Sequence, residues 1–308
     1  MMPDIVQRPR LDYDGAMKRV LAIDIGGTKI AVGIVDTHGT VHAKSSAKTP
    51  RGDPGAVVSL ARALAAEAGF EAGGADAVGV ALPGVVDEAG ETLVHSPSSG
   101  WDNVPFTRLF REAFGLPVAA ANDVNACALA EAVFGSGKGY DPFLWVTVST
   151  GIGGALYCGG KVLHGAHGMA GEIGHMVVRP GGACCACGNR GCLEAEAAGP
   201  AWARKAASFM VTSDMAAPPA AVPRTADAYA DAKAVADGAR AGDSVCLAVV
   251  DDVADALASG IGSAITLVDP RAVFLGGGVA GAADLLIPRL EALLPDRVLA
   301  WKIGRAHV

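Results

Sequence analysis

Residues 19–36 read RVLAIDIGGTKIAVGIVD, two apolar runs joined by a pair of glycines. The first run, 19–24, predicts a buried strand, and the second, 29–36, is rich in β-branched residues and predicts another. Gly26 and Gly27 therefore join two strands, whereas a dinucleotide-binding fingerprint has a helix after its glycines. Because glycine has no side chain, backbone N–H groups at such a turn can approach phosphate oxygens closely.

The same turn carries three polar side chains, Asp24, Thr28 and Lys29. A hydroxyl and a cation suit phosphate directly, whereas a carboxylate would act through Mg²⁺ or a bound water because like charges repel. A glycine pair between strands is more often a plain hairpin. The turn is therefore a candidate phosphate site that needs support from elsewhere in the chain.

That support comes from a second strand–glycine–strand pattern. Residues 143–149 predict a strand, 150–154 (TGIGG) a glycine turn, and 155–158 a return strand. A late strand at 272–275 precedes a third glycine turn at 276–278. The repetition predicts an α/β fold with a duplicated mixed sheet and a central cleft between two halves. The candidate nucleotide-binding residues of the later turns are Thr150, Gly151, Gly153, Gly277 and Gly278.

Hydrophobic periodicity and turn residues place the remaining elements. Helices are expected at 54–70, 106–114, 122–134 and 243–268, and further strands at 77–82 and 118–121. The stretch 211–225 is rich in Ala and Pro and predicts a surface loop.

Asn122 and Asp123 stand where a strand is expected to give way to a helix. An acidic residue at a helix start is commonly only a cap. The functional interpretation is that Asp123 accepts a proton from a substrate hydroxyl, with Asn122 bonded to another hydroxyl. Phosphoryl transfer is helped by such a positioned base, although placement and charge neutralisation supply most of the catalysis.

The segment CACGNRGCLE, residues 185–194, is preceded by His175. Three thiols, Cys185, Cys187 and Cys192, and one imidazole suit tetrahedral Zn²⁺, and a complete Cys₃His set would make the ion structural. The alternatives are reactive thiols or buried cysteines beside an unrelated histidine. Cys184 could also take the place of Cys185.

Two glutamates lie close to these residues in sequence, Glu172 before His175 and Glu194 after Cys192. If a metal fixes the loop, both carboxylates gain fixed directions and become good acceptors for sugar hydroxyls. Each taken singly would more often be a solvated surface charge.

Bulk composition narrows the class of protein. Of 308 residues, 51% are hydrophobic and 19% charged, which allows a sizeable core. The net charge of −7 argues against nucleic-acid and anionic-membrane partners. Three aspartates interrupt the longest apolar region, 246–268, and no secretory signal is visible near the N-terminus, so we expect a cytoplasmic protein without membrane spans.

Taken together, these motifs resemble the ROK family of repressors and sugar kinases, within the hexokinase/actin-like ATPase (ribonuclease H-like) fold. The resemblance begins near Val20. The matching segments are DIGGTK at 24–29, LPG at 82–84, Gly-Trp at 100–101, NDVNA at 122–126, STGIGG at 149–154, GEIGH at 171–175, CACGNRGCLE at 185–194 and LGGGVA at 275–280.

The resemblance implies a transferase that moves the γ-phosphoryl group of ATP, with Mg²⁺, to the 6-hydroxyl of a hexose. Glucose is the first choice, and N-acetylmannosamine or N-acetylglucosamine are alternatives. Asp123 falls on the family's catalytic base. The positions that fall on its sugar contacts are Gly84, Asn122, Asp123, Glu172, His175 and Glu194, and those that fall on its Zn²⁺ ligands are His175, Cys185, Cys187 and Cys192. A homodimer or higher homo-oligomer is common in the family.

Other functions are weighed against this one. Family repressors carry an additional N-terminal DNA-binding region. The expected extension at 1–17 is too short for such a region, which argues against a repressor. The strand after Gly27 argues against an NAD-dependent enzyme, which would have a helix there. The presence of Asp24 and Asp123 argues against a sugar-binding protein that has lost its catalytic activity.

The expected organisation follows from the same comparison. Residues 18–121 form a small domain with the first phosphate turn, and 122–308 form a larger one with the second phosphate turn, the zinc loop and the adenosine turn. Two departures are noted. Ser98 stands where family glucokinases often have Asn, and the family's final helix, beyond a segment like 303–308, is expected to be missing.

Overall fold

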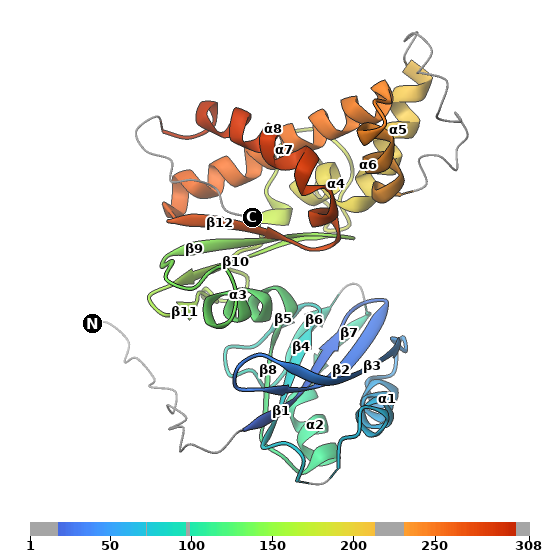
Figure 1. Cartoon of the computed structure of the whole chain (residues 1–308), viewed down its shortest axis with the longest axis vertical. Helices are drawn as coiled ribbons and strands as arrows, with labels where there is room; N and C mark the ends of the chain where they lie inside the picture. Colours follow the sequence, from blue (N-terminus) through green and yellow to red (C-terminus); the bar gives the residue numbers. More distant parts are fainter. Residues whose placement is uncertain (1–17, 72, 97–98, 213–230, 300–308) are drawn as a thin grey trace. The chain divides into compact units, whose positions relative to one another are not determined.

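The computed structural model describes residues 18–71, 73–96, 99–212 and 231–299 (Figure 1). These form two compact units that divide between Ala121 and Asn122. Each unit combines a sheet with helices, in agreement with the predicted α/β class. The expected extension at 1–17, Ser98, the segment 303–308 and all but two residues of the expected loop at 211–225 lie outside the described residues.

The first unit is built on a mixed five-stranded sheet in the order β3-β2-β1-β4-β8. Its strands are β1 (Arg19–Ile25), β2 (Lys29–Asp36), β3 (Val41–Lys48), β4 (Ala77–Leu82) and β8 (Val118–Asn122). Its helices are α1 (Pro54–Glu67) and α2 (Phe106–Phe114), and a smaller antiparallel sheet contains β5 (Val85–Val86), β6 (Leu93–Ser96) and β7 (Trp101–Val104).

Alternation along β1 explains where the core of the first unit lies. Leu21, Ile23 and Ile25 are at most 2% exposed and belong to the buried cluster that also takes in apolar residues of α1 and α2. The side chain between the last two, Asp24, points to the other face and is exposed. A period of two therefore fixes which face of the sheet the helices cover.

Helix α1 begins where the carboxylate of Asp53 accepts a hydrogen bond of 2.8 Å from the Gly55 N–H. It ends at Glu67, three residues before the expected end at position 70. The cause is Gly69, whose φ of +78° lies in the left-handed region that favours glycine and closes a helix C-terminus.

The second unit contains a mixed four-stranded sheet in the order β11-β10-β9-β12. Its strands are β9 (Phe143–Val148), β10 (Ile152–Cys158), β11 (Lys161–Val162) and β12 (Ala272–Gly276). Its helices are α3 (Asp123–Val133), α4 (Leu193–Ala197), α5 (Gly199–Thr212), α6 (Ala232–Arg240), α7 (Ser244–Val268) and α8 (Ala283–Leu293).

Helices cover both faces of this sheet (Figure 1). Leu144, Val146 and Val148 pack into the large cluster shared with α4 to α8, whereas Phe143 packs into a smaller cluster with Ala128 of α3. No helix among the described residues is long and apolar enough to cross a membrane.

The predicted repetition is present as a repeated topology. Strand β1 pairs with β2 antiparallel and with β4 parallel. Strand β9 pairs with β10 antiparallel and with β12 parallel. Both glycine turns, at 26 and 151, therefore join the first two strands of the same three-stranded arrangement.

The second turn is shorter than the sequence predicts. Strand β10 starts at Ile152, so Gly153 and Gly154 belong to the strand instead of the turn. Both still have to be glycine for reasons of space. A Cβ at Gly153 would lie 2.7 Å from the Val124 side chain, and one at Gly154 would lie 2.7 Å from the Gly171 carbonyl oxygen.

Candidate functional site

The first glycine turn, in the first unit, is held by backbone and side-chain hydrogen bonds. The Gly26 N–H donates to the Lys29 carbonyl at 2.9 Å. The Thr49 hydroxyl donates to the Gly26 carbonyl at 2.7 Å, and the Thr49 N–H donates to the Thr28 carbonyl at 3.0 Å. Thr49, just beyond β3, therefore supports the turn from one side.

Asp24 lies near the end of β1, before that turn. Partial desolvation raises the pKa of this carboxyl above its ordinary value, and the charges of Lys44 and Lys29 oppose the shift. The side chain is nevertheless exposed on the sheet surface. The Asp24 carboxylate is thus reachable from solvent, and its local environment disfavours an uncompensated negative charge. A bound cation would compensate that charge.

Gly84 follows β4, the strand whose Ala81 pairs with Asp24. Its φ is +138°, and a Cβ at this position would overlap the His95 carbonyl oxygen. Only glycine fits here, because both the backbone conformation and the close approach exclude a side chain. The predicted sugar contact at Gly84 would have to be made by its backbone.

Asn122 and Asp123 begin α3, in the second unit. The Asn122 side-chain oxygen accepts the capping hydrogen bond from the Asn125 N–H at 3.0 Å. Asp123 is the first helical residue, and its Oδ1 accepts from the Asn122 Nδ2 at 3.1 Å and from the Val124 N–H at 2.9 Å. The cap is therefore Asn122, and Asn122 also orients the Asp123 carboxylate.

Glu194 contacts the second glycine turn directly. Its Oε2 accepts a hydrogen bond of 3.0 Å from the Ile152 N–H. A Cβ on Gly151 would lie 2.5 Å from the same oxygen, so a larger residue at this position would displace the Glu194 carboxylate. On the other side, Val124 of α3 packs on Gly153. The structure thus brings Glu194 and the start of α3 to the beginning of β10, next to this turn.

The segment that carries Glu172 and His175 lies against the same strand. A Cβ at Gly174 would overlap the Ile152 carbonyl oxygen, and one at Gly171 would overlap the Gly154 carbonyl oxygen. These two glycines therefore let the segment pack on β10. The His175 Nε2 lies 3.9 Å from the Glu172 carboxylate.

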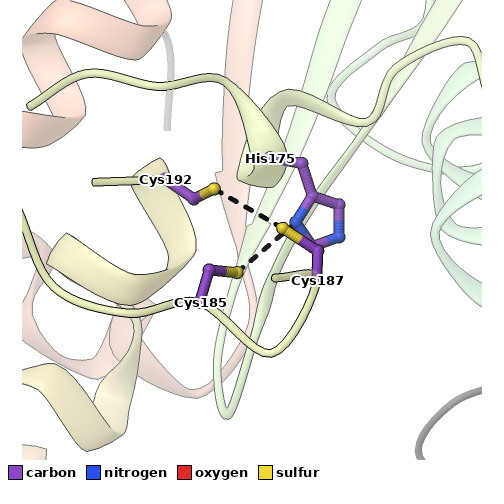
Figure 2. Close-up of side chains that lie close together, drawn as sticks. All are labelled: His175, Cys185, Cys187 and Cys192. Atoms are coloured by element: carbon purple, nitrogen blue, oxygen red, sulfur yellow. Dashed lines mark hydrogen bonds between the residues drawn. The ribbon is translucent and has the colours of Figure 1, made fainter. Parts of the chain in front are cut away.

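Four potential metal ligands converge in the second unit, His175, Cys185, Cys187 and Cys192 (Figure 2). Their ligand atoms all lie within 4.8 Å of one another. The Cys187 and Cys192 sulfurs are 3.7 Å apart, and the Cys185 sulfur is 3.7 Å from the His175 Nδ1. A tetrahedral zinc ion with Zn–S bonds of about 2.3 Å requires edges of about 3.8 Å, so the residues fit this ion.

The neighbouring thiol, Cys184, is outside the cluster. It is exposed, and its sulfur accepts a hydrogen bond of 2.7 Å from the Arg190 guanidinium. Cys185 instead is buried and faces His175. The geometry favours Cys185 over Cys184 as the fourth side chain of the set.

The thiols of the cluster have dissimilar acidities. A hydrogen bond from the Asn189 backbone, followed by one from the Cys185 thiol, lowers the pKa of Cys187 to about 7. Burial and the neighbouring thiols raise the pKa of Cys192 to about 12. A cation that replaced the protons would satisfy both groups, since metal ligation requires thiolates.

The third glycine turn follows β12. Gly277 has φ +90°, and a Cβ there would overlap the Val148 carbonyl oxygen. Gly278 opens a short 3₁₀ helix, Gly278–Ala282. A small apolar cavity beneath this turn is lined by Val148, Leu257, Leu275, Gly276, Val279, Ala280, Ala283, Leu286 and Ile287.

The structure gathers most of the expected site residues of the second unit around β10 and the segment 171–194, whereas Gly277 lies against Val148 of β9. Asp24 to Lys29 and Gly84 belong to the first unit, where they lie at the ends of the adjacent strands β1 and β4. Sequence reasoning missed Thr49 and Val124, which support the two turns. Neither carries a local signal, because each acts through a contact with a distant segment.

The chain is similar to known proteins over most of its length. A family model described as the ROK family matches residues 20–304. The glucokinase of Streptomyces coelicolor is 37% identical over 191 residues, which are 62% of this chain and 59% of that protein. The N-acetylmannosamine kinase of Yersinia pestis is 37% identical over 187 residues, 60% of this chain and 63% of that protein. The chain thus spans about three fifths of the length of both relatives.

A solved structure is similar over nearly the whole chain. It is a ROK family glucokinase from Streptomyces griseus in complex with glucose and AMPPNP, with a TM-score of 0.81 at 31% identity. The similarity covers 94% of this chain and 93% of that one. The predicted fold class is thereby confirmed.

Proposed function

The chain belongs to the ROK family, and on that premise we propose that it is an ATP-dependent hexose kinase that phosphorylates the 6-hydroxyl of glucose. The observation that carries the proposal is that Glu194 and the start of α3 both contact β10 where it leaves the second glycine turn. A phosphate turn, a fixed carboxylate and a candidate base then share one strand. The glucokinase of Streptomyces griseus, which is similar in structure, was crystallised with glucose and an ATP analogue.

Asp123 is proposed as the base that receives the proton of the 6-hydroxyl. Its carboxylate is oriented by hydrogen bonds from Asn122 and Val124, which reduces the freedom it would lose on engaging a substrate. The proposed acceptors and donors for the other sugar hydroxyls are Glu172, His175, Glu194, Asn122 and the backbone of Gly84.

The nucleotide is proposed to bind through the three glycine turns, with Asp24, Thr28, Lys29 and Thr150 as the polar contacts. When bound, Mg²⁺ would neutralise the phosphate charge, and Asp24 would orient it directly or through water.

We also propose a structural Zn²⁺ on His175, Cys185, Cys187 and Cys192. The support is that the four ligand atoms lie within 4.8 Å of one another, with two of the separations at 3.7 Å. All four positions are filled by protein, so the ion would fix the loop and leave the chemistry to other groups. Because Glu194 follows Cys192 by two residues, the ion would also fix the direction of that carboxylate.

Metal analysis tests this zinc site. The wild-type protein is expected to contain about one zinc per chain, and Cys185→Ser to lose most of it. Cys184→Ser is the matched control because the thiol is adjacent but outside the cluster, and it should retain its zinc. Equal zinc in both variants would exclude the proposed ligand set.

The sugar is tested with a coupled ADP-release assay over a panel of hexoses and N-acetylhexosamines. Glucose is expected to give the highest kcat/KM. N-acetylmannosamine is the second candidate, because a kinase for that sugar is as similar in sequence as the glucokinase. Absence of ADP release with every sugar in the panel would contradict the kinase proposal itself.

Two further proposals are a cytoplasmic location and, from the resemblance to the family, a homodimer or higher homo-oligomer. Analytical ultracentrifugation of the purified protein tests the second. A single species with the mass of one chain at micromolar concentration would exclude it.

A further inference from the structure

The Cys loop, defined here as residues 179–192, is anchored at its base by buried and half-buried charged side chains that take no part in the Cys/His cluster. Glu196, on α4, is 4% exposed. Its Oε1 accepts a hydrogen bond of 2.7 Å from the Ala183 N–H, and a Cβ at Gly182 would overlap the same oxygen. One carboxylate oxygen therefore holds the backbone at the start of the cysteine segment.

The other oxygen of Glu196 connects the loop to two long helices. Lys205 of α5 donates to it at 2.9 Å and also to the Asp252 carboxylate of α7 at 2.6 Å. The Arg179 guanidinium donates two hydrogen bonds of 2.9 Å to Asp252, one to the side-chain carboxylate and one to the backbone carbonyl of that residue. These four residues carry two positive and two negative charges, and Arg179 extends the network to Asp255, 3.3 Å away, which also pairs with Arg297.

Arg179 also holds the far end of the Cys loop through its backbone. Its N–H donates to the Gly191 carbonyl at 3.1 Å, and a Cβ at Gly191 would overlap the Arg179 carbonyl oxygen. The Gly191 N–H donates to the Ala183 carbonyl at 2.8 Å. The residues next to Cys192 are thus fixed by contacts that involve no thiol.

We propose that Glu196, Lys205, Arg179 and Asp252 are positioning residues that hold the Cys loop, and with it Glu194, in place whether or not a metal is bound. Glu194 is two residues from Glu196 on the same short helix, and it is the carboxylate that contacts the second glycine turn. A displacement of these four residues should therefore also displace Glu194, which is a proposed sugar contact. The part concerning the sugar rests on the proposed kinase function, and the part concerning the loop does not.

Because the charges of the network balance, single and double substitutions in it should have different effects. Glu196→Gln keeps the shape but leaves one net positive charge in a shielded site, which costs more than removing both members of the pair. Lys205→Met leaves one net negative charge. The double variant Glu196→Gln/Lys205→Met is balanced again, so its effects should be smaller than the sum of the two single ones.

The first experiment needs no variant. Hydrogen exchange at the Ala183 amide is measured in the wild-type protein, before and after zinc is stripped with a chelator. We expect this amide to stay protected while amides at the tip, such as Gly188, exchange faster after stripping. Loss of protection at Ala183 on stripping would show that the metal alone holds the loop and would overturn the proposal.

The second experiment compares Glu196→Gln with Glu291→Gln, the same substitution at an exposed position of α8. In Glu196→Gln we expect Ala183 exchange, zinc transfer to a chromogenic chelator and sugar KM all to rise, each by about 10-fold or more, with kcat less affected. The double variant should recover part of each effect, and Glu291→Gln should match the wild type.

The outcomes separate this inference from the proposed function. A Glu196→Gln variant with a lower Tm but unchanged exchange, zinc release and sugar KM would indicate only a structural role and would overturn the proposal. If the wild type has no kinase activity, the kinase proposal fails, and the exchange measurement at Ala183 still decides whether the anchor exists.

Discussion

The two units carry strand–turn–strand hairpins of the same topology but of different construction. The first turn, at 24–29, bears the charged residues Asp24 and Lys29 and is supported from one side by Thr49. The second, at 149–151, bears only hydroxyls, and Glu194, Val124 and the segment at 171–175 enclose it together with the first three residues of β10. The first turn is therefore suited to bind charged groups, and the second is suited to keep the neighbouring side chains in fixed positions.

The difference indicates that substitutions in the second unit should damage catalysis through misplacement, and those in the first through lost charge. In a phosphoryl transfer both are needed, since positioning and charge neutralisation supply most of the rate enhancement. Measurements on matched variants can separate the two contributions, beginning with the base.

Asp123→Asn should have the largest effect. The variant keeps the size of the side chain and its place at the start of α3 but cannot accept the hydroxyl proton. A fall in kcat of about 10²–10⁴ is expected, with zinc content and Tm close to wild type. Asp269→Asn is the matched control, because that exposed residue has φ +49°, which Asn tolerates. Near-normal turnover of Asp123→Asn would remove the base from the proposal.

Gly151→Ala against Gly26→Ala tests the enclosure directly. In the second turn the new Cβ lies 2.5 Å from the Glu194 carboxylate, whereas in the first it lies 3.1 Å from the Lys29 carbonyl oxygen. Displacing Glu194 by about 1 Å should reduce kcat/KM by about 10²-fold, and Gly26→Ala should have a severalfold effect. Equal losses in steady-state kinetics would contradict the distinction between the two turns.

Asp24→Asn tests the charge of the first turn. Turnover should fall by about 10–100-fold if the carboxylate orients a bound cation, and added Mg²⁺ should restore part of it. Stability should change in the opposite direction. Because the folded-state pKa of Asp24 is raised, its ionisation lowers stability as pH rises through the interval above its ordinary value of 3.8.

Thermal unfolding at several pH values checks this stability effect. The Asn variant should have a slightly higher Tm than the wild type at neutral pH, and the difference should disappear near pH 3, where Asp24 is protonated in both states. A lower Tm at neutral pH would show that the interactions with Lys44 and Lys29 outweigh desolvation.

The smallest expected effect lies in the β2–β3 hairpin. The hydrogen bond from the Thr40 N–H is the largest cause that lowers the pKa of Asp36 to about 2, and His42 and the His38 N–H add to it. Such a group stabilises the folded state above its ordinary pKa of 3.8, and this contribution is lost as pH falls from about 4 to about 2. Asp36→Asn should therefore flatten the acid limb of the Tm profile without changing kinase activity at neutral pH.

The sequence was sufficient where the signal is local. The apolar alternation on both sides of Gly26 predicts β1 and β2, and β4 and α2 begin and end where periodicity places them. Strand β3 gives no such signal. It reads VHAKSSAK and lies at the edge of its sheet, where it buries little and carries Lys44 and Lys48.

The candidate site was predictable in its residue types and less so in its contacts. Metal-ligand spacing identifies Cys185, Cys187 and Cys192, because the three thiols lie within eight residues of sequence. The hydrogen bond from Ile152 to Glu194 joins residues 42 apart, and the close approach of Gly174 to the Ile152 carbonyl depends on how two segments pack. Such contacts arise only when separate segments are folded together.

The anchor of the Cys loop has a consequence for the order of events during synthesis. Arg179 is 73 residues away from Asp252, its partner on α7. On a growing chain all four proposed metal ligands leave the ribosome before α7 does, so the thiols must pass a period without this support. Binding of the proposed metal ion and formation of the Arg179–Asp252 pair would then be separate folding steps, and closing the long connection between residues 179 and 252 would belong to the later one.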